Sequence, residues 1–281
     1  MKRKSYPSDL TNEQWAVLEE LIPPAKPGGC PRQHHMRELL NALFYHVREG
    51  GSWRAIPHDF GIPWKTVYNY FRAWTDDGTW ERLVTALRIR VRLAARRDPR
   101  PKVGYIDSQS VKTAQGGEQR GYDGGKKVQG RKRHIVVDSL GLLLAVVVTA
   151  ASVDDARAAQ DLFAEMPGRN YPRLQVVWAD SKYHNYELYD WLSVHRRPYQ
   201  VVVVSRPPGV QGWVRLPKRW LVERTLAWLG RYRRLSKDYE KRTDTSAAMV
   251  QISALHHMLR RLKPKQSQDR FHYKRPQNTA A

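Results

Sequence analysis

The sequence predicts an α/β fold in which a helical N-terminal region precedes a mixed-sheet core with C-terminal helices. Residues 10–97 carry apolar side chains at helical spacing, whereas residues 98–262 alternate short β-branched runs with amphipathic helices. The segment 96–102, RRDPRPK, is typical of a linker. We therefore predict three parts, 1–97, 98–262 and 263–281, the last a basic tail expected to be disordered.

Caps and apolar spacing predict the first two helices. Thr11 and Gln14 form a capping box before a short helix, which Pro23 and Pro24 end. After a loop rich in Pro and Gly, a second helix ends at Gly50 and presents one apolar face. This face consists of Met36, Leu39, Leu40, Leu43, Phe44 and Val47.

A helix-turn-helix unit is predicted next, before a fourth helix that begins at Thr79. Its first helix is 52–57, its turn is 58–61, and its second helix is 63–74, the helix that would lie in the major groove of DNA. The inward residues of the second helix are Val67, Phe71 and Trp74, and its DNA-facing residues are Lys65, Thr66, Asn69 and Arg72. An ordinary helical bundle with a solvated face has the same spacing, and the net charge favours DNA.

The second region is expected to run strand, strand, strand, helix, strand, helix, strand, helix, helix. The strands are expected at 103–108, 133–138, 142–149, 174–179 and 199–205. A turn at 139–141 makes the second and third of these a hairpin. The helices are expected at 154–166, 185–196, 217–235 and 244–262.

The charge balance predicts a polyanionic partner. The chain has 281 residues, with 49 Lys and Arg against 27 Asp and Glu, a formal net charge of +22, and 41% apolar residues. The apolar content suffices for a folded core, and the charge favours nucleic acid first and an anionic membrane surface second. The longest apolar run, 140–151, is shorter than the about 20 residues that cross a bilayer, and no signal peptide is evident. With one cysteine, Cys30, we expect a cytoplasmic protein that associates with the nucleoid when bound to DNA.

Three acidic residues contrast with this basic background. Asp107 ends the first strand, in YIDSQSVK, Asp180 ends the fourth, in VVWADSKYH, and Glu223 lies on a helix, in PKRWLVERTLAWLGRYRRL. The carboxyl ends of strands are where α/β sheets place their sites. Three carboxylates at one point repel each other unless a divalent cation neutralises them, and oxygen ligands suit Mg²⁺ or Mn²⁺. Two such ions about 4 Å apart promote phosphoryl transfer.

Each acidic residue also has a structural interpretation. An Asp at a strand end commonly forms a turn or caps a helix. Glu223 has a partner for a surface ion pair in Arg219, four residues earlier. Position in the sequence does not establish that the three side chains converge.

A glycine-rich, basic stretch at 116–133, GGEQRGYDGGKKVQGRKR, is predicted to be a mobile loop that approaches phosphates closely. A solvated, flexible lead into the hairpin explains the same composition. The cations of this stretch include Lys126, Lys127, Arg131, Lys132 and Arg133.

Together these blocks resemble bacterial insertion-sequence transposases of the DDE class, in the group named for insertion sequence five. The front block, at 50–83, is GGSWRAIPHDFGIPWKTVYNYFRAWTDDGTWERL. The other blocks are YIDSQSVKT, GRKRHIVVDSLGLLLAVVVTAASVDDA, VWADSKYHN and LPKRWLVERTLAWLGRYRRLSKDYE. The resemblance implies an RNase H-like catalytic core in which Asp107, Asp180 and Glu223 are the catalytic metal ligands. It also implies Mg²⁺ as the cofactor, with Mn²⁺ as a substitute.

The sequence departs from the wider superfamily pattern around the Glu, Tyr-x2-Arg-x3-Glu-x6-Lys. Arg219 and Glu223 fit this pattern, whereas Leu216 replaces the Tyr and Gly230 replaces the Lys. The pattern implies that Arg219 and a nearby basic residue handle DNA ends. The candidates for the missing Lys are Arg231, Arg233 and Arg234.

The resemblance implies a DNA transposase. Such a protein would bind the terminal inverted repeats of its element, hydrolyse a phosphodiester bond there, and use the freed 3′-hydroxyl to attack target DNA. The expected partners are double-stranded DNA, at element ends and target, and further copies of the chain in a homodimer or larger assembly, with no membrane partner. Two alternatives stay open: an RNase H-like nuclease without strand transfer, and a catalytically silent, sequence-specific DNA-binding regulator.

Overall fold

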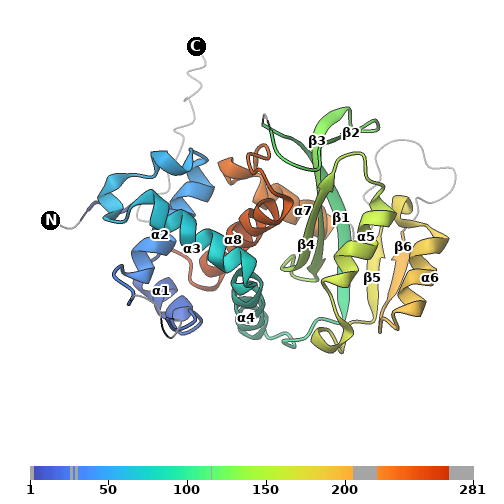
Figure 1. Cartoon of the computed structure of the whole chain (residues 1–281). Coiled ribbons are helices and arrows are strands. Elements are labelled where there is room, and N and C mark those ends of the chain that lie inside the picture. Colours follow the sequence, from blue (N-terminus) through green and yellow to red (C-terminus); the bar gives the residue numbers. More distant parts are fainter. Residues whose placement is uncertain (1–2, 26–27, 29–30, 115, 205–219, 266–281) are drawn as a thin grey trace, which may run out of the picture.

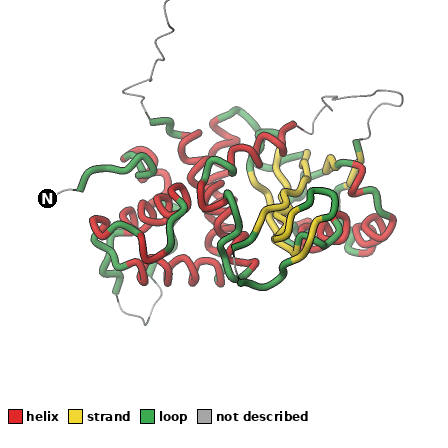
Figure 2. The backbone as a smooth tube through the Cα atoms, turned by 90° about the horizontal axis from the view of Figure 1, so that it is seen from above, coloured by secondary structure: helices red, strands yellow, loops and turns green. Residues whose placement is uncertain are grey.

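The computed structural model describes residues 3–25, 28, 31–114, 116–204 and 220–265 (Figure 1). A helical half lies against one face of a mixed sheet, and further helices cover the other face. Figure 2 shows the helical half beside the half that contains the strands. The predicted fold class, a helical region followed by a mixed-sheet α/β core with C-terminal helices, is confirmed.

The N-terminal helices form where caps and apolar spacing predict them. They are α1 (Asn12–Glu19), α2 (Met36–Glu49), α3 (Trp64–Asp76) and α4 (Thr79–Ala94). The capping box is present, since the Gln14 amide donates to Thr11 Oγ1 and the Thr11 amide donates to Gln14 Oε1, both at 3.2 Å. α2 ends at Gly50, whose φ of +80° favours glycine and where a Cβ would lie 2.9 Å from the backbone of Arg233.

The stretch before α3 differs from the predicted helix-turn-helix. Residues 52–57 contain only the 3₁₀ turn η1 (Trp53–Ala55), and the expected turn contains a second one, η2 (His58–Phe60). Pro57 and Pro63 flank η2 and lack the amide hydrogen that a continuing helix needs, so the predicted first helix does not form there. The second helix is confirmed as α3, and its buried residues include Val67, Phe71 and Trp74.

Among the described residues, six strands form one mixed sheet in the order β2-β3-β1-β5-β6, with β4 paired to β3. β1, β3 and β4 are antiparallel, whereas β1, β5 and β6 are parallel. This is the RNase H-like sheet that the resemblance implies, and the β3–β4 hairpin is confirmed. The strands are β1 (Val103–Lys112), β2 (Gly121–Asp123), β3 (Val128–Asp138), β4 (Leu143–Ala150), β5 (Val176–Ala179) and β6 (Gln200–Val203).

Two stretches of the second region differ from the prediction. The stretch 116–133, expected to be a mobile loop, contains β2 and the beginning of β3, because these two strands pair with each other. The single helix expected at 217–235 is interrupted, since α7 (Trp220–Leu229) ends before Gly230 and a 3₁₀ turn, η5 (Arg233–Leu235), follows. The expected start of that helix lies in 205–219, outside the described residues.

The two faces of the sheet have different cover. α5 (Asp155–Ala164) and α6 (Tyr186–Val194) cover one face, and α7 and α8 (Thr243–Leu262) cover the other (Figure 1). Side chains alternate between faces along a strand, so Tyr105 packs against the helical half and Ile106 packs toward α5 and α6. Because α8 also contacts α2 and α4, the N-terminal helices share one continuous core with the sheet.

The described helices also bear on the membrane question. None of them combines the length and apolar character needed to cross a bilayer.

A buried histidine predicts that stability falls in acid. His46 on α2 stacks on Trp53 with 4.0 Å between ring centroids, and its Nε2 has no hydrogen-bond partner among the described residues. Burial, followed by the charge of Arg234, lowers the pKa of His46 from 6.5 to about 3. Unfolding frees the imidazole to bind a proton below pH 6.5. The free energy of unfolding therefore falls toward lower pH, by up to about 1.4 kcal/mol per pH unit from this group.

Urea unfolding at about pH 7 and about pH 5 measures this loss. His46→Phe keeps an aromatic ring against Trp53 and binds no proton. We expect the unfolding free energy of this variant to fall less between the two pH values than that of the parent. Other buried histidines contribute equally to both proteins, so the difference between parent and variant reports on His46. Equal losses of unfolding free energy in the two proteins would contradict the prediction.

Candidate active site

Asp107 and Asp180 lie at the same level on neighbouring parallel strands. β1 and β5 pair with Tyr105 opposite Trp178, and each Asp comes two residues later in its own strand direction. Two residues further along a strand, the side chain returns to the same face. Tyr105 and Trp178 both pack against the helical half. The register thus sets the two carboxylates beside each other on that face, at the carboxyl end of β5.

Backbone hydrogen bonds orient both carboxylates. Asp107 Oδ1 accepts a hydrogen bond from the amide of Ser108 at 2.7 Å. Asp180 Oδ1 accepts one from the amide of Lys182 at 2.9 Å and caps the 3₁₀ turn η4 (Ser181–Tyr183). The capping interpretation of a strand-end Asp is therefore correct for Asp180, and the cap holds its carboxylate in a fixed direction beside Asp107.

The buried side chain of Tyr183 is influenced by three acidic residues. Its side chain is fully buried, and Ser108 is a polar neighbour of its hydroxyl. Burial raises the pKa of this hydroxyl well above its ordinary value, and the charges of Asp107, Asp155 and Asp180 raise it further. Three carboxylates from different segments therefore lie near one neutral phenol.

A buried polar cluster lies on the opposite face of the sheet and includes Ser108, the residue after Asp107. Ser108 Oγ donates to Asp155 Oδ1 at 2.7 Å, and Lys132 Nζ lies 3.4 Å from the same oxygen. His134 belongs to this cluster, and burial lowers its pKa to about 4. The structure differs here from the expectation that Lys132 contacts DNA, because its ammonium group is buried and paired with Asp155.

Glu223 lies on α7, one of the helices that cover the same face of the sheet as Tyr105. α7 packs against β1 and β3, and its Leu221 and Val222 belong to the core that contains Tyr105. The side chain of Glu223 is exposed. Within the described residues, no three His, Cys, Asp or Glu side chains form a group suited to a metal ion. The structure thus sets Asp107 and Asp180 at one level on neighbouring strands, and it places Glu223 on α7, which packs against the same sheet.

The predicted DNA-facing residues of α3 lie away from the core. Lys65 and Asn69 are exposed, whereas Thr66 and Arg72 are half-buried. Arg72 is already paired, since its Nη2 lies 2.9 Å from Asp76 Oδ1. Lys65 and Asn69 are therefore the residues of this set that offer unobstructed polar groups to a ligand.

Two lysines of the glycine-rich stretch stay at the surface. Lys126 and Lys127 are both exposed. Lys126 Nζ donates to the carbonyl oxygen of Ser108 at 3.1 Å, directly after Asp107. Its positive charge therefore lies near the aspartate pair.

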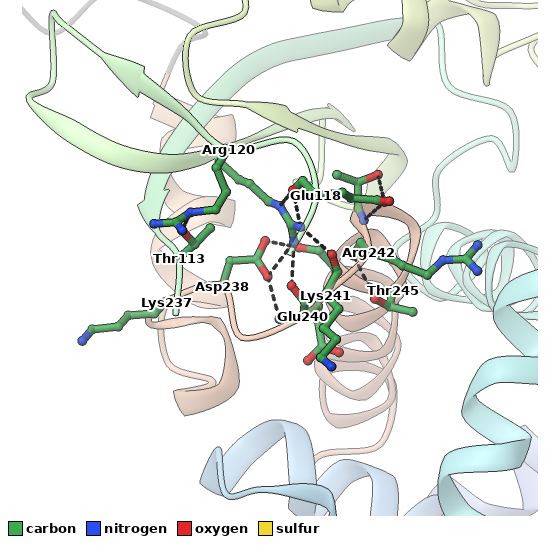
Figure 3. A network of polar contacts seen from close by, with 12 residues as sticks. Thr113, Glu118, Arg120, Lys237, Asp238, Glu240, Lys241, Arg242 and Thr245 are labelled. Atoms are coloured by element: carbon green, nitrogen blue, oxygen red, sulfur yellow. Dashed lines mark hydrogen bonds and ion pairs between the residues drawn. The ribbon is translucent and has the colours of Figure 1, made fainter. Parts of the chain in front are cut away.

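Arg131 is fully buried and joins three segments of the chain. Its partners Glu118, Asp238, Glu240 and Lys241 are labelled in Figure 3. Its guanidinium donates to the carbonyl oxygens of Glu118, Glu240 and Lys241 at 2.5–3.0 Å, and Nη1 lies 3.4 Å from Asp238 Oδ1. These bonds link β3 to the loop before β2 and to the segment before α8. The structure differs from the expectation that Arg131 contacts DNA, because its donors are used inside the protein.

The basic residues after α7 have different environments. Arg231 is exposed. Arg234 is 8% exposed, and its guanidinium donates to Glu240 Oε1 at 2.7 Å and to the carbonyl oxygen of Gly51 at 3.1 Å. Arg234 thereby ties η5 to the stretch before η1. Arg219 lies outside the described residues.

Tyr183 and Asp155 are site neighbours that sequence reasoning missed. The sequence indicates only a helix start at Asp155, and the cap itself is made by Asp154. A local signal for Tyr183 exists, because it follows Asp180 by three residues at the end of a buried strand. Asp155 reaches the cluster from a different part of the chain, so no local spacing indicates it.

Family models match both regions of the chain. The model described as "Transposase DDE domain" matches residues 98–259. The model described as "Putative transposase of IS4/5 family" matches residues 10–84. The first match covers more than half of the chain and contains Asp107, Asp180 and Glu223.

Two curated proteins of Burkholderia cepacia are similar to parts of the chain. The "Putative transposase for insertion sequence element IS402" is 33% identical over 135 residues, which are 44% of this chain and 60% of that protein. The "Insertion element IS402 uncharacterized 16.2 kDa protein" is 28% identical over 119 residues, which are 40% of this chain and 78% of that protein.

A solved structure gives a weaker match. The "Crystal structure of the Mos1 mariner paired end complex with Mn" covers 63% of this chain and 61% of its own, with 14% identity and a TM-score of 0.23. That score is too low to support an argument. The match at 98–259 rests on the sequence itself, and by it the chain belongs to the family of proteins that carry a transposase DDE domain.

Proposed function

We propose that the protein is a DNA transposase that binds the terminal inverted repeats of an insertion sequence, hydrolyses a phosphodiester bond there and transfers the strand to target DNA. The observation that carries this proposal is the pair of carboxylates, Asp107 and Asp180, at one level on neighbouring strands. They lie in a chain of net charge +22. Two acids side by side on a basic protein would repel DNA unless a cation joined them.

Asp107 and Asp180 fit a divalent cation. Mg²⁺ is usually held by one or two protein carboxylates together with substrate phosphates, and it keeps several waters. We propose Mg²⁺ as the resident ion, Mn²⁺ as a substitute, and Glu223 as a third ligand that α7 contributes when DNA is bound. When bound, the metal would lower the pKa of the attacking water and stabilise the leaving oxygen.

The chain itself would position the reacting groups. The backbone amides of Ser108 and Lys182 orient the carboxylates of Asp107 and Asp180. The Tyr183 hydroxyl, kept neutral by burial, lies within electrostatic reach of both carboxylates and adds no charge of its own. Lys126 adds a positive charge near the place where a scissile phosphate would lie.

The surface basic residues would hold the duplex. We propose that α3 contacts the element end through Lys65 and Asn69, and that Lys126, Lys127 and Arg231 contact phosphates. The partners would be double-stranded DNA at the element ends and the target, bound by a homodimer or larger assembly. This activity would place the protein in the cytoplasm with the nucleoid.

The test uses labelled duplexes that carry the terminal repeats of the element. We expect the protein to cleave them with Mg²⁺, to stop when EDTA is added, and to join the freed 3′ end to a second duplex. Cleavage without joined products would identify a nuclease. Specific, salt-sensitive binding without cleavage in Mg²⁺ or Mn²⁺ would identify a silent regulator.

A further inference from the structure

A groove with a volume of about 740 Å³ lies beside α3. This volume is in the range of sites that enclose small organic ligands. One wall comes from η1 and α3, and the other comes from η5, the beginning of α8 and the segment between them. We name it the arginine–aromatic groove. The lining residues that matter here are Arg54, Trp64, Tyr68, Arg72, Tyr239 and Lys241.

The groove has an excess of positive charge. Five of its lining residues are Arg or Lys, and one is Glu. Three of the five are arginines that pair with acidic side chains. Arg54 and Lys241 make no ion pair within the part of the chain that the structure describes. These two cations are therefore available to an anionic ligand. Each of them can contact one phosphate of a nucleic acid.

Aromatic rings line the same groove. Arg54 lies over Trp64, 5.6 Å from the ring centroid. Tyr239 is 39% exposed, with Arg234 5.1 Å from its ring centroid. Rings in a cationic groove are the platforms on which proteins stack unpaired bases, with little dependence on sequence. Bases inside a duplex already stack on each other, so this lining favours unpaired DNA over duplex DNA.

The groove is connected to the aspartate pair through β1. Thr113 bridges to Asp238 (Figure 3), and the next residue, Tyr239, lines the groove. Thr113 follows Asp107 by six residues, which is about 20 Å along an extended strand. That length corresponds to about six base steps of duplex DNA. On its other side the groove includes Arg72, one of the predicted DNA-facing residues of α3.

We propose that the arginine–aromatic groove binds unpaired DNA, with Arg54 and Lys241 on the phosphates and a base stacked on Tyr239. The proposal rests on the proposed function, because it assigns to the groove a strand that leaves the duplex near Asp107 and Asp180. The groove thereby adds a second DNA site, for a separated strand, to the duplex contacts of α3.

The test measures the binding of labelled oligothymidine, and of a duplex that carries the element's terminal repeat, by fluorescence anisotropy at several salt concentrations. We expect Tyr239→Ala to weaken oligothymidine binding at least about fivefold, and Tyr239→Phe to bind as the parent does. Arg54→Ala with Lys241→Ala should lower the salt slope by about 1.4, because two phosphate contacts are lost.

Matched controls lie elsewhere on the surface. Tyr186→Ala removes a ring that is 76% exposed on α6, and Arg97→Ala with Lys102→Ala removes two exposed charges near the opposite end of β1. Neither should change oligothymidine binding. Duplex binding should be unchanged in Tyr239→Ala.

Two outcomes would overturn the groove proposal: parental oligothymidine binding by Tyr239→Ala, or an equal loss of duplex and oligothymidine binding. Cleavage of element ends is measured in parallel. If the parent cleaves and Tyr239→Ala binds normally, only the groove proposal fails. If the parent never cleaves while the groove variants lose oligothymidine binding, only the proposed function fails.

Discussion

Replacing Asp180 by Asn should lower metal-dependent cleavage of an element end by about a thousandfold, because the amide removes the charge of a proposed metal ligand. A bound metal contributes several kcal/mol of transition-state stabilisation, and each 1.36 kcal/mol corresponds to a tenfold change in rate. Asp107→Asn should have a similar effect, since Asp107 lies beside Asp180 in the β1–β5 register. The measurement is single-turnover cleavage of a labelled duplex with saturating Mg²⁺.

The same substitution should leave the fold intact. Asp180 caps η4 by accepting a hydrogen bond from the Lys182 amide, and Asn caps as well as Asp does. Circular dichroism and DNA binding should therefore match the parent. Asp190→Asn, the same change at an exposed position on α6, is the control and should cleave normally. Undiminished cleavage by Asp180→Asn would refute the assignment of the site.

Replacing Arg131 by Met should destabilise the protein by about 3–5 kcal/mol. Removing one partner of a buried charged network leaves the others uncompensated. Here the change removes the cation beside Asp238, which is 2% exposed, and the guanidinium donors to the carbonyl oxygens of Glu118, Glu240 and Lys241. Met fills a similar volume, so the loss reports on the polar bonds. Thermal and urea unfolding measure the effect.

Lys127→Met is the matched control for this prediction. Lys127 lies in the same glycine-rich stretch and is exposed, so its stability should change by less than about 0.5 kcal/mol. Its affinity for DNA should fall, because one phosphate contact is lost. The opposite pattern, a stable Arg131→Met protein with weakened DNA binding, would restore Arg131 as a DNA contact and contradict its structural role.

Local patterns predicted most of the elements. The Thr11–Gln14 capping box and the inward residues of α3 are where spacing places them, because caps and helical faces involve residues a few positions apart. The order of strands and helices in the second region follows from the same kind of signal. The exceptions are short elements, since η1 and β2 depend on neighbouring prolines and on pairing with β3, respectively.

The candidate site was predictable in part. The sequence predicts Asp107 and Asp180 at strand ends. In the structure β1 continues to Lys112, so Asp107 lies inside the strand, and the parallel pairing of β1 with β5 sets the two residues side by side. Asp155 and Tyr183 were not predictable as their neighbours, because that contact depends on how α5 and η4 pack on the sheet. The environment of Glu223 likewise depends on the packing of α7.

The sequence by itself determined the α/β order of elements, the excess of positive charge and the three acids that stand out against it, because composition and short-range spacing carry that information. The tertiary structure decided which cations are at the surface. Arg131 and Lys127 are four positions apart, yet one is fully buried and the other is exposed. The difference comes from partners such as Glu240, 109 residues away. Only folding brings these groups together.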